Sequence, residues 1–239
     1  MKNSCPDPMG QAIWDYYYDA SPAPIQVFSD VAEEEVIEPS HLFRSYWQMP
    51  PVEKAALDQC KGKVLDIGAG AGCHAKILAE RGFAVTALEA SSLAAKVLAQ
   101  RLDQPVFEKA IFTDEIPGTY DTLLLMMNGI GICGTMDGLR QLLGLAKKLL
   151  NPGGQVVLDS ADIWYLLGDE GVETRIMETQ RYYGEVRYQM AYKGDTGEAF
   201  NWLYVDFGSL KQVAESQGYK VEKLMDSRDF QYLARLTLA

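Results

Sequence analysis

Cysteine and histidine are scarce in this sequence, which narrows the chemistry open to it. Its 239 residues include two histidines, His41 and His74, and four cysteines, of which none form a C-x-x-C pair. The cysteines are Cys5, Cys60, Cys73 and Cys133. Neither a structural zinc site nor a disulfide framework is therefore indicated, and we expect no bound metal. A Cys-His hydrolase is also hard to build, because Cys73 and His74 are neighbours in sequence and not a spatial pair.

Long apolar runs and clustered positive charge are also missing. The longest apolar run, 123–127, falls far short of the roughly 20 residues that span a bilayer, and the N-terminus has no apolar signal core. The formal net charge is −11, and no Lys/Arg cluster offers a surface for phosphate backbones. We therefore expect a cytoplasmic monomer or homodimer, with neither a membrane nor a nucleic acid as its partner.

Strands and helices alternate from residue 61 onward. Short apolar segments predict strands at 63–67, 84–89, 105–108, 120–127 and 155–159. Helical spacing and capping residues predict helices at 73–80, 91–102 and 139–150, with a turn at 151–154. This order predicts an α/β fold, a parallel sheet covered by helices on both faces.

The ends of the chain carry additions to that alternation. Residues 1–60 are rich in aromatics and prolines, which predicts an N-terminal cap of short helices and turns. Two aromatic segments, 181–192 and 199–207, predict a β-hairpin of about 180–207 inserted after the fifth strand. A helix from Ser209 and a strand pair at 219–225 and 231–238 follow. We therefore divide the chain into a cap, 1–60, and one domain, 61–239.

The segment from Val64 to Gly72 is the most informative part of the sequence. It reads V-L-D-I-G-A-G-A-G, a D-x-G-x-G-x-G pattern where the first strand turns into the first helix. Glycines allow a tight turn and let a ligand approach the backbone, and the following helix offers its N-terminal amides. Glu89 ends the second strand about 20 residues later, where an acid can bind both hydroxyls of a ribose. The pattern predicts a nucleoside-bearing ligand at this edge.

Two positions speak against a dinucleotide as that ligand. The dinucleotide pattern G-x-G-x-x-G requires Gly or Ala at position 73, where this sequence has Cys73. Asp66 would repel a diphosphate, whereas it would attract a ligand with an amino group or a sulfonium. An NAD-dependent oxidoreductase therefore stays as an alternative and not as the first hypothesis.

These motifs resemble those of class I S-adenosylmethionine-dependent methyltransferases. The run V-L-D-I-G-A-G-A-G-C-H-A-K-I-L-A-E-R-G-F-A-V-T-A-L-E-A-S resembles the first two motifs of that superfamily. The segments 120–134 and 149–160 resemble its fourth and fifth strands with their neighbours. The resemblance implies a Rossmann-like, doubly wound, seven-stranded sheet with an antiparallel last strand, and S-adenosylmethionine as the cofactor.

The resemblance also assigns residues to that cofactor. The implied contacts are Asp66, Gly68, Ala69, Gly70, Gly72, Glu89, Ala90, Ile111 and Asn128. The glycines would line the methionine portion, with Asp66 near its amino group, Glu89 on the ribose and Ala90 beside the adenosine. Ile111 would face the adenine, since the usual acid or amide after the third strand is not evident. Asn128, at the end of the fourth strand, would face the sulfonium and the substrate.

Other candidates come from residue chemistry and keep open alternatives. Arg44 could pair with the cofactor's carboxylate or form a surface salt bridge, and Tyr18 could cover the site or pack within the cap. Asn128 could be a turn former, and Asp159 could be a general base or, with Asp162, part of a magnesium site. The aromatics Trp164, Tyr165, Tyr182, Tyr183, Trp202 and Tyr204 could wall a substrate pocket or fill a core.

The acceptor is expected to be a small molecule. Superfamily members that methylate exocyclic amines carry a D/N-P-P-Y/F motif, whereas this sequence has Asn128-Gly129-Ile130-Gly131 at that place. Together with the net negative charge, this favours methyl transfer to an unidentified small molecule. The glycine pattern predicts binding but not turnover, so a non-catalytic S-adenosylmethionine-binding protein stays as a further alternative.

Overall fold

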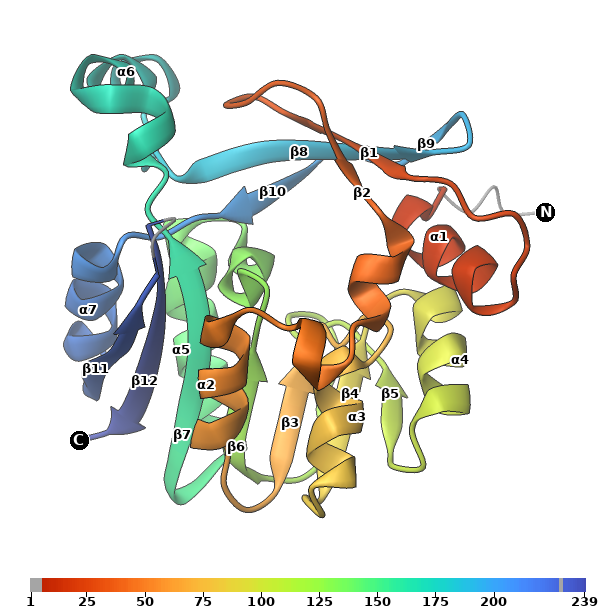
Figure 1. The fold of residues 1–239 in the computed structure, drawn as a ribbon. Helices are drawn as coiled ribbons and strands as arrows, with labels where there is room; N and C mark the ends of the chain where they lie inside the picture. Colours follow the sequence, from red (N-terminus) through yellow and green to blue (C-terminus); the bar gives the residue numbers. More distant parts are fainter. Residues whose placement is uncertain (1–5, 228–229) are drawn as a thin grey trace.

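The main sheet of the computed structural model confirms the predicted fold class (Figure 1). The structure describes residues 6–227 and 230–239, so Cys5 lies outside it. Seven strands run in the order β11-β12-β7-β6-β3-β4-β5, and β12 is antiparallel to both of its neighbours. Their bounds are Val64–Ile67 (β3), Val85–Glu89 (β4), Val106–Glu108 (β5), Tyr120–Leu125 (β6), Leu150–Ala161 (β7), Tyr219–Asp226 (β11) and Gln231–Leu238 (β12).

Helices cover both faces of this sheet, each by burying an apolar stripe. On one face lie α5 (Met136–Leu149) and α7 (Phe207–Ser216), and on the other α2 (Pro51–Gln59), α3 (Cys73–Glu80) and α4 (Ser92–Arg101). The buried positions of α5 are Leu139, Leu142, Leu143, Ala146 and Leu149, one helical stripe. Thr135 caps α5 by accepting a hydrogen bond from the Gly138 amide at 3.0 Å.

A second sheet, here called the roof sheet, lies over the carboxyl edge of the main sheet (Figure 1). It combines β1 (Ile25–Ser29) and β2 (Glu35–Ile37) with β8 (Glu185–Tyr192), β9 (Asp195–Thr196) and β10 (Phe200–Leu203). The strands β8 and β10 form the predicted hairpin. The predicted helical cap is corrected in part: α1 (Pro8–Tyr17), η1 (Pro39–Phe43) and η2 (Tyr46–Gln48) are helical, but β1 and β2 are strands. They pair with each other, and β8, from far along the chain, pairs with the other edge of β1.

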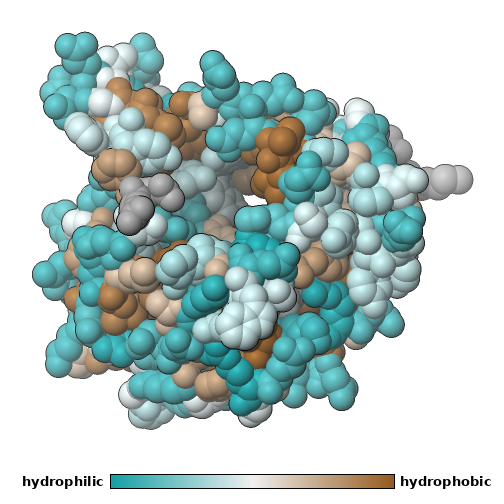
Figure 2. All heavy atoms as spheres, viewed as in Figure 1, coloured by the Kyte–Doolittle hydropathy of each residue, from teal (hydrophilic) through white to brown (hydrophobic). Residues whose placement is uncertain are grey.

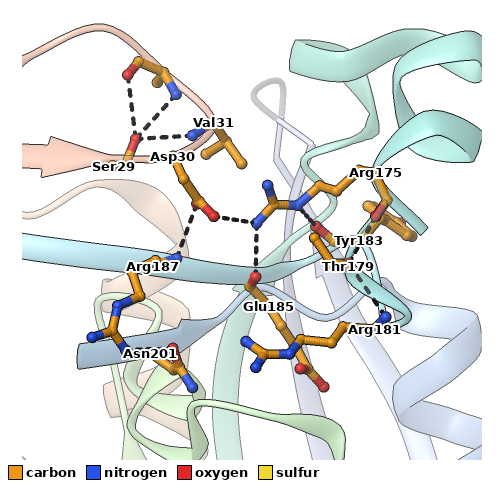
Figure 3. Close-up of polar contacts among 11 residues, drawn as sticks. Ser29, Asp30, Val31, Arg175, Thr179, Arg181, Tyr183, Glu185, Arg187 and Asn201 are labelled. Carbon is orange, nitrogen blue, oxygen red and sulfur yellow. Dashed lines mark hydrogen bonds and ion pairs between the residues drawn. The ribbon is translucent and has the colours of Figure 1, made fainter. Parts of the chain in front are cut away.

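The helix α6 (Trp164–Thr179) was not predicted, and it has no buried residue. Its sequence lacks an apolar stripe because the helix packs on no core, and its backbone breaks at Gly168. Arg175 ties it to the roof sheet (Figure 3): its guanidinium donates to Asp30 at 2.9 Å and to the carbonyls of Tyr183 at 2.9 Å and Glu185 at 2.8 Å. Asp30 in turn accepts the Arg187 amide of β8 at 2.9 Å.

Two local predictions differ from the structure. Residues Asn151–Gly154 were expected to form a turn, but they belong to β7 as an irregularity in its pairing with β6. Phe207 was expected to end a strand, but it begins α7, because Asp206 caps that helix by accepting the Ser209 amide at 2.9 Å. No helix within residues 6–227 and 230–239 has the length and apolar character needed to cross a membrane.

Candidate functional site

A large cavity lies between the carboxyl edge of the main sheet and the roof sheet. Its volume is about 1010 Å³. The floor comes from the ends of β3, β4 and β6 and the loops after them, and the upper wall from β1, β2, β8 and β10. Figure 2 shows the recess between the upper sheet and the body below it. Ligands of doubly wound sheets bind at the carboxyl ends of the strands, and pockets for one small ligand span roughly 300–1,000 Å³. This cavity therefore lies where such ligands bind, and its volume is at the top of that range.

The loop after β3 has the backbone that the glycine pattern predicts. Gly68, Gly70 and Gly72 have φ angles of 74°, 55° and 83°, which residues with a Cβ rarely adopt. A Cβ at Gly68 or Gly70 would point into open space, and both residues line the cavity together with Ala69. A Cβ at Gly72 would lie 2.3 Å from Leu98 Cδ1 of α4. Gly72 therefore allows helix packing and is not part of the cavity wall.

Glu89 braces this loop from the end of β4. Its Oε2 accepts the Gly70 amide at 2.7 Å, and its Oε1 accepts the Ser91 amide at 2.8 Å. Burial raises the pKa of Glu89, although these two bonds oppose the rise. Each carboxylate oxygen keeps a second lone pair, so Glu89 is free to accept hydroxyl groups of a ligand. Ala90, exposed beside it, also lines the cavity.

Asp66 brings a buried acceptor to the cavity floor. The residue is 2% exposed, and its Oδ2 has no hydrogen-bond partner among the described residues. Burial raises the pKa of Asp66, against the positive charge of His74 and a bond from the Ala75 amide. A buried polar atom without a partner is costly. A cationic donor such as a ligand's amino group would satisfy it.

Arg44 lies behind the cavity in an ion-pair cluster, not on its wall. The Arg44 guanidinium donates to both oxygens of Glu53, at 2.6 and 2.8 Å, and Glu53 also bonds His74 Nε2 at 2.9 Å. All three side chains are buried. The cluster joins α2 to the first turn of α3, directly after the glycine loop. The sequence prediction for Arg44 is thus corrected: the acid that it pairs with belongs to this chain.

His41 and His74 line the cavity and escaped the sequence prediction. His41 accepts a hydrogen bond from the Arg44 guanidinium. Burial, together with this positive charge, lowers the pKa of His41, so its imidazole is neutral at pH 7. His41 thus bonds a residue three positions away, whereas the partner of His74, Glu53, is brought to it by the tertiary fold and leaves no signal in the sequence pattern.

Tyr18 and Ile111 do not line the cavity. Tyr18 follows α1 and is 49% exposed, with its ring 4.6 Å from that of Trp14. Ile111 is 3% exposed and packs in the core beneath the sheet edge, against α5. Ile111 therefore does not offer an adenine-facing surface here, because the turn after β5 directs its side chain inward.

Asn128 and Asp159 bond to each other instead of facing the cavity. Asn128 has a left-handed backbone, with φ 53°, and its amide donates to both Asp159 oxygens at 2.9 and 3.0 Å. The Asn128 side chain accepts from Ser160 Oγ at 3.0 Å. Asp159 is fully buried and also accepts from Gln231 Nε2 at 2.6 Å. The structure therefore makes Asp159 an anchor between strands and not a base within reach of an acceptor.

Asp159 should leave a signature in the pH dependence of stability. Burial raises its pKa from 3.8 to about 6, although bonds from Asn128 and Gln231 oppose the shift. Between those values the folded chain binds more protons than the unfolded chain, so the free energy of unfolding falls as pH rises. We expect Asp159→Asn to remove up to about 3 kcal/mol of that fall. Urea unfolding of the wild type and the variant at several pH values measures this difference in the free energy of unfolding.

The control for this experiment is Asp162→Asn, at a half-buried neighbouring acid. Relative to the wild type, the Asp159→Asn variant should gain stability as pH rises through the window, whereas the control should not. A constant offset between the Asp159→Asn variant and the wild type at all pH values would contradict the assignment.

The aromatic wall predicted from the inserted segment is present in part. Trp202 and Tyr204 line the cavity, and they are joined by Tyr188 and Phe200, which were not predicted. Trp164 and Tyr165 instead lie on α6 and are 43% and 48% exposed. The hydroxyls of Tyr182 and Tyr183 bond to Asp206 and Asp162 away from the cavity. The residues that line the cavity thus lie on β8 and β10 or directly after β10, whereas the others lie on α6 or before β8.

Comparison with known proteins gives the family. No protein-family model matches the chain, and no curated protein matches it. Among solved structures, it is similar to a SAM-dependent methyltransferase from Bacteroides fragilis in complex with S-adenosyl-L-homocysteine. The two share 37% sequence identity over 99% of this chain and 98% of that one, with a TM-score of 0.88. The chain therefore belongs to the S-adenosylmethionine-dependent methyltransferases.

More distant structures share the fold alone. The CcbJ methyltransferase from Streptomyces caelestis is 16% identical, with a TM-score of 0.61 over 80% of this chain and 97% of that one. CalS10, a SAM-bound amino pentose methyltransferase from Micromonospora echinaspora, is 16% identical, with a TM-score of 0.52 over 78% and 87%. Family membership sets aside the alternative of an NAD-dependent oxidoreductase.

Proposed function

We propose that this chain transfers a methyl group from S-adenosylmethionine to a small molecule bound beneath the roof sheet. One observation carries the proposal: Asp66, the Gly68–Gly70 loop and Glu89 face one cavity that has room for a second ligand. The unpartnered Asp66 Oδ2 and the open space at both glycines fit the amino group and the methionine portion of the donor. The relative from Bacteroides fragilis was crystallised with the demethylated form of this donor.

The donor supplies a methyl group activated by a sulfonium, so the residues of the chain need only bind, orient and exclude water. Asp66 would hold the amino group through its free oxygen. Glu89 would accept the ribose hydroxyls while it keeps the Gly70 amide in place. The roof sheet would seal the acceptor against the ends of β3 and β6. Asp159 is buried off the cavity wall, so the proposal gives it no proton-transfer role.

The cavity walls support a small acceptor and not a polymer. The roof sheet lies over the carboxyl edge of the main sheet (Figure 1), and residues of both sheets line the cavity between them. Among the described residues, no Lys or Arg lines this space, and phosphate backbones are bound through such residues. A cytoplasmic location and a monomeric or homodimeric state stay predictions from the sequence.

A turnover assay distinguishes a methyltransferase from a protein that binds the donor without catalysis. The purified chain is incubated with S-adenosylmethionine and pools of small amines, phenols and thiols, and the S-adenosylhomocysteine formed is quantified. We expect S-adenosylhomocysteine to form only when one of the acceptor pools and the folded chain are both present. Tight donor binding without formation above background in any pool would favour the non-catalytic alternative.

A further inference from the structure

One face of the roof sheet presents a continuous aromatic surface to the cavity. Tyr188 pairs across the strands with Phe200, and their rings stack with centroids 6.1 Å apart. Trp202 meets Phe200 edge-on at 6.1 Å, and the hydroxyls of Tyr188 and Tyr204 lie 3.0 Å apart. All four line the cavity and are only half-buried. Rings that fill a core would be fully buried, so this surface is available to a ligand.

The loop after β6 is shaped to receive this surface. The loop forms η3 (Gly129–Cys133), and a Cβ at Gly131 would lie 2.1 Å from Trp202 Nε1. Only glycine lets the indole lie on that backbone. Gly129 and Met127 of the same segment line the cavity. The aromatic surface therefore adjoins the end of β6 and shares one cavity with the glycine loop that would hold the donor.

Apart from His74, the charged side chains that line the cavity are acidic. Five carboxylate residues line it: Asp7, Glu35, Asp66, Glu89 and Glu198. Within the part of the chain that the structure describes, no Lys or Arg side chain lines it to offset them. Asp7 and Glu89 bond to Ser91 on the floor, at the donor side. Glu35, on β2, and Glu198, before β10, belong to the roof and are exposed.

We propose that the methyl acceptor is a small amine, which enters as a cation and rests its apolar body on the aromatic surface. This inference rests on the proposed function and names its substrate class. Aromatic faces attract ammonium groups, and the carboxylates of Glu35 and Glu198 add an attraction at the mouth. An anionic acceptor would meet repulsion from every charged side chain of the wall except a protonated histidine.

Methyl transfer to the amine begins with the loss of a proton. The ammonium releases one proton to water at the mouth of the cavity, which leaves a lone pair on nitrogen. That pair forms the new bond to the methyl carbon, and the electrons of the broken carbon–sulfur bond pass to sulfur, which becomes a neutral thioether. The positive charge passes from sulfur to nitrogen, so the product is a methylated ammonium ion and leaves as the cation in which it forms.

Matched probes test the substrate class. The chain is first saturated with S-adenosylhomocysteine and then titrated, by ligand-observed NMR, with 2-phenylethylamine, 2-phenylethanol and 3-phenylpropanoate. The three share a ring and differ in charge. We expect the amine to bind at least about tenfold more tightly than the alcohol, and the carboxylate to bind most weakly.

Single substitutions test which residues cause the tighter binding of the amine. Glu35→Gln and Phe200→Leu should each reduce the advantage of the amine over the alcohol at least about threefold without changing S-adenosylhomocysteine affinity. Glu34→Gln is the matched control, since Glu34 neighbours Glu35 and does not line the cavity. Equal or tighter binding of the alcohol or the carboxylate, no binding of any probe, or an equal effect of Glu34→Gln would overturn the amine proposal. Failure to bind S-adenosylhomocysteine would instead reject the proposed function.

Discussion

Replacing Gly70 with arginine should lower the affinity for S-adenosylmethionine at least about 100-fold. The Gly70 Cβ direction leads into the open space of the cavity, so an arginine side chain would occupy the place assigned to the donor. Its φ of 55° also strains any residue with a Cβ, at a cost of roughly 1–2 kcal/mol. Equilibrium dialysis with labelled S-adenosylmethionine measures the loss, and circular dichroism checks that the chain is folded.

Gly82→Arg is the matched control for this change. Gly82 also has a positive φ, of 88°, and a Cβ there would likewise point into open space. It follows α3, at the end of the sheet away from the cavity, and does not line it. The control shares the backbone strain and the added charge, so it should bind the donor normally. Normal binding by the Gly70→Arg variant, or equal loss in both variants, would contradict the placement of the donor.

Replacing Glu53 with alanine should cost roughly 3–5 kcal/mol of unfolding free energy. Glu53 is the shared partner of Arg44 and His74, and the three side chains are only 5–7% exposed. Its removal leaves the guanidinium and the imidazole buried without their acceptor, which is the costly case for a buried ion pair. The midpoint of urea unfolding at pH 7 measures the loss.

The same cluster gives a pH dependence of known sign. Burial works to raise the pKa of Glu53, but the hydrogen bond and charge of His74 and the Arg44 guanidinium outweigh it and lower that pKa below 4.5. A lowered folded-state pKa adds stability above the unfolded value, and this stability is lost as pH falls through the folded value. The advantage of the wild type over Glu53→Gln should therefore shrink on acidification below pH 4.5. An advantage that is unchanged by pH would contradict the ionised cluster.

The main sheet was predictable because its signals are local. The strand at 64–67, the glycines after it and Glu89 at the end of β4 form one strand–turn–helix–strand unit, and the structure brings Asp66, Gly68, Ala69, Gly70, Glu89 and Ala90 to one cavity as the pattern implies. The apolar stripe of α5 likewise depends only on helical spacing. Such units contain both partners of each contact within a short stretch of sequence.

The roof sheet and the ion-pair cluster were not predictable in this way. Strand β1 pairs with β8 through contacts such as Val27 with Met190, between segments far apart in the chain. The sequence around Val27 alone shows only a short apolar segment among prolines. The ion-pair partner of Arg44 was not predictable either. A carboxylate of the ligand or of a surface residue was equally compatible with the sequence, and the structure shows that of Glu53. No periodic signal links either pair, because β1 and β8 are far apart in the chain and because Arg44 and Glu53 belong to different elements.

The most direct test of the account is a calorimetric titration of the wild-type chain with S-adenosylhomocysteine, with NAD⁺ titrated in parallel. Asp66 and Glu89 are arranged for a ligand with an amino group and a ribose, and Asp66 would repel a diphosphate. We predict one site per chain, with micromolar affinity for S-adenosylhomocysteine and no heat of binding from NAD⁺. No binding of S-adenosylhomocysteine at millimolar concentration, or tighter binding of NAD⁺, would contradict the central claim.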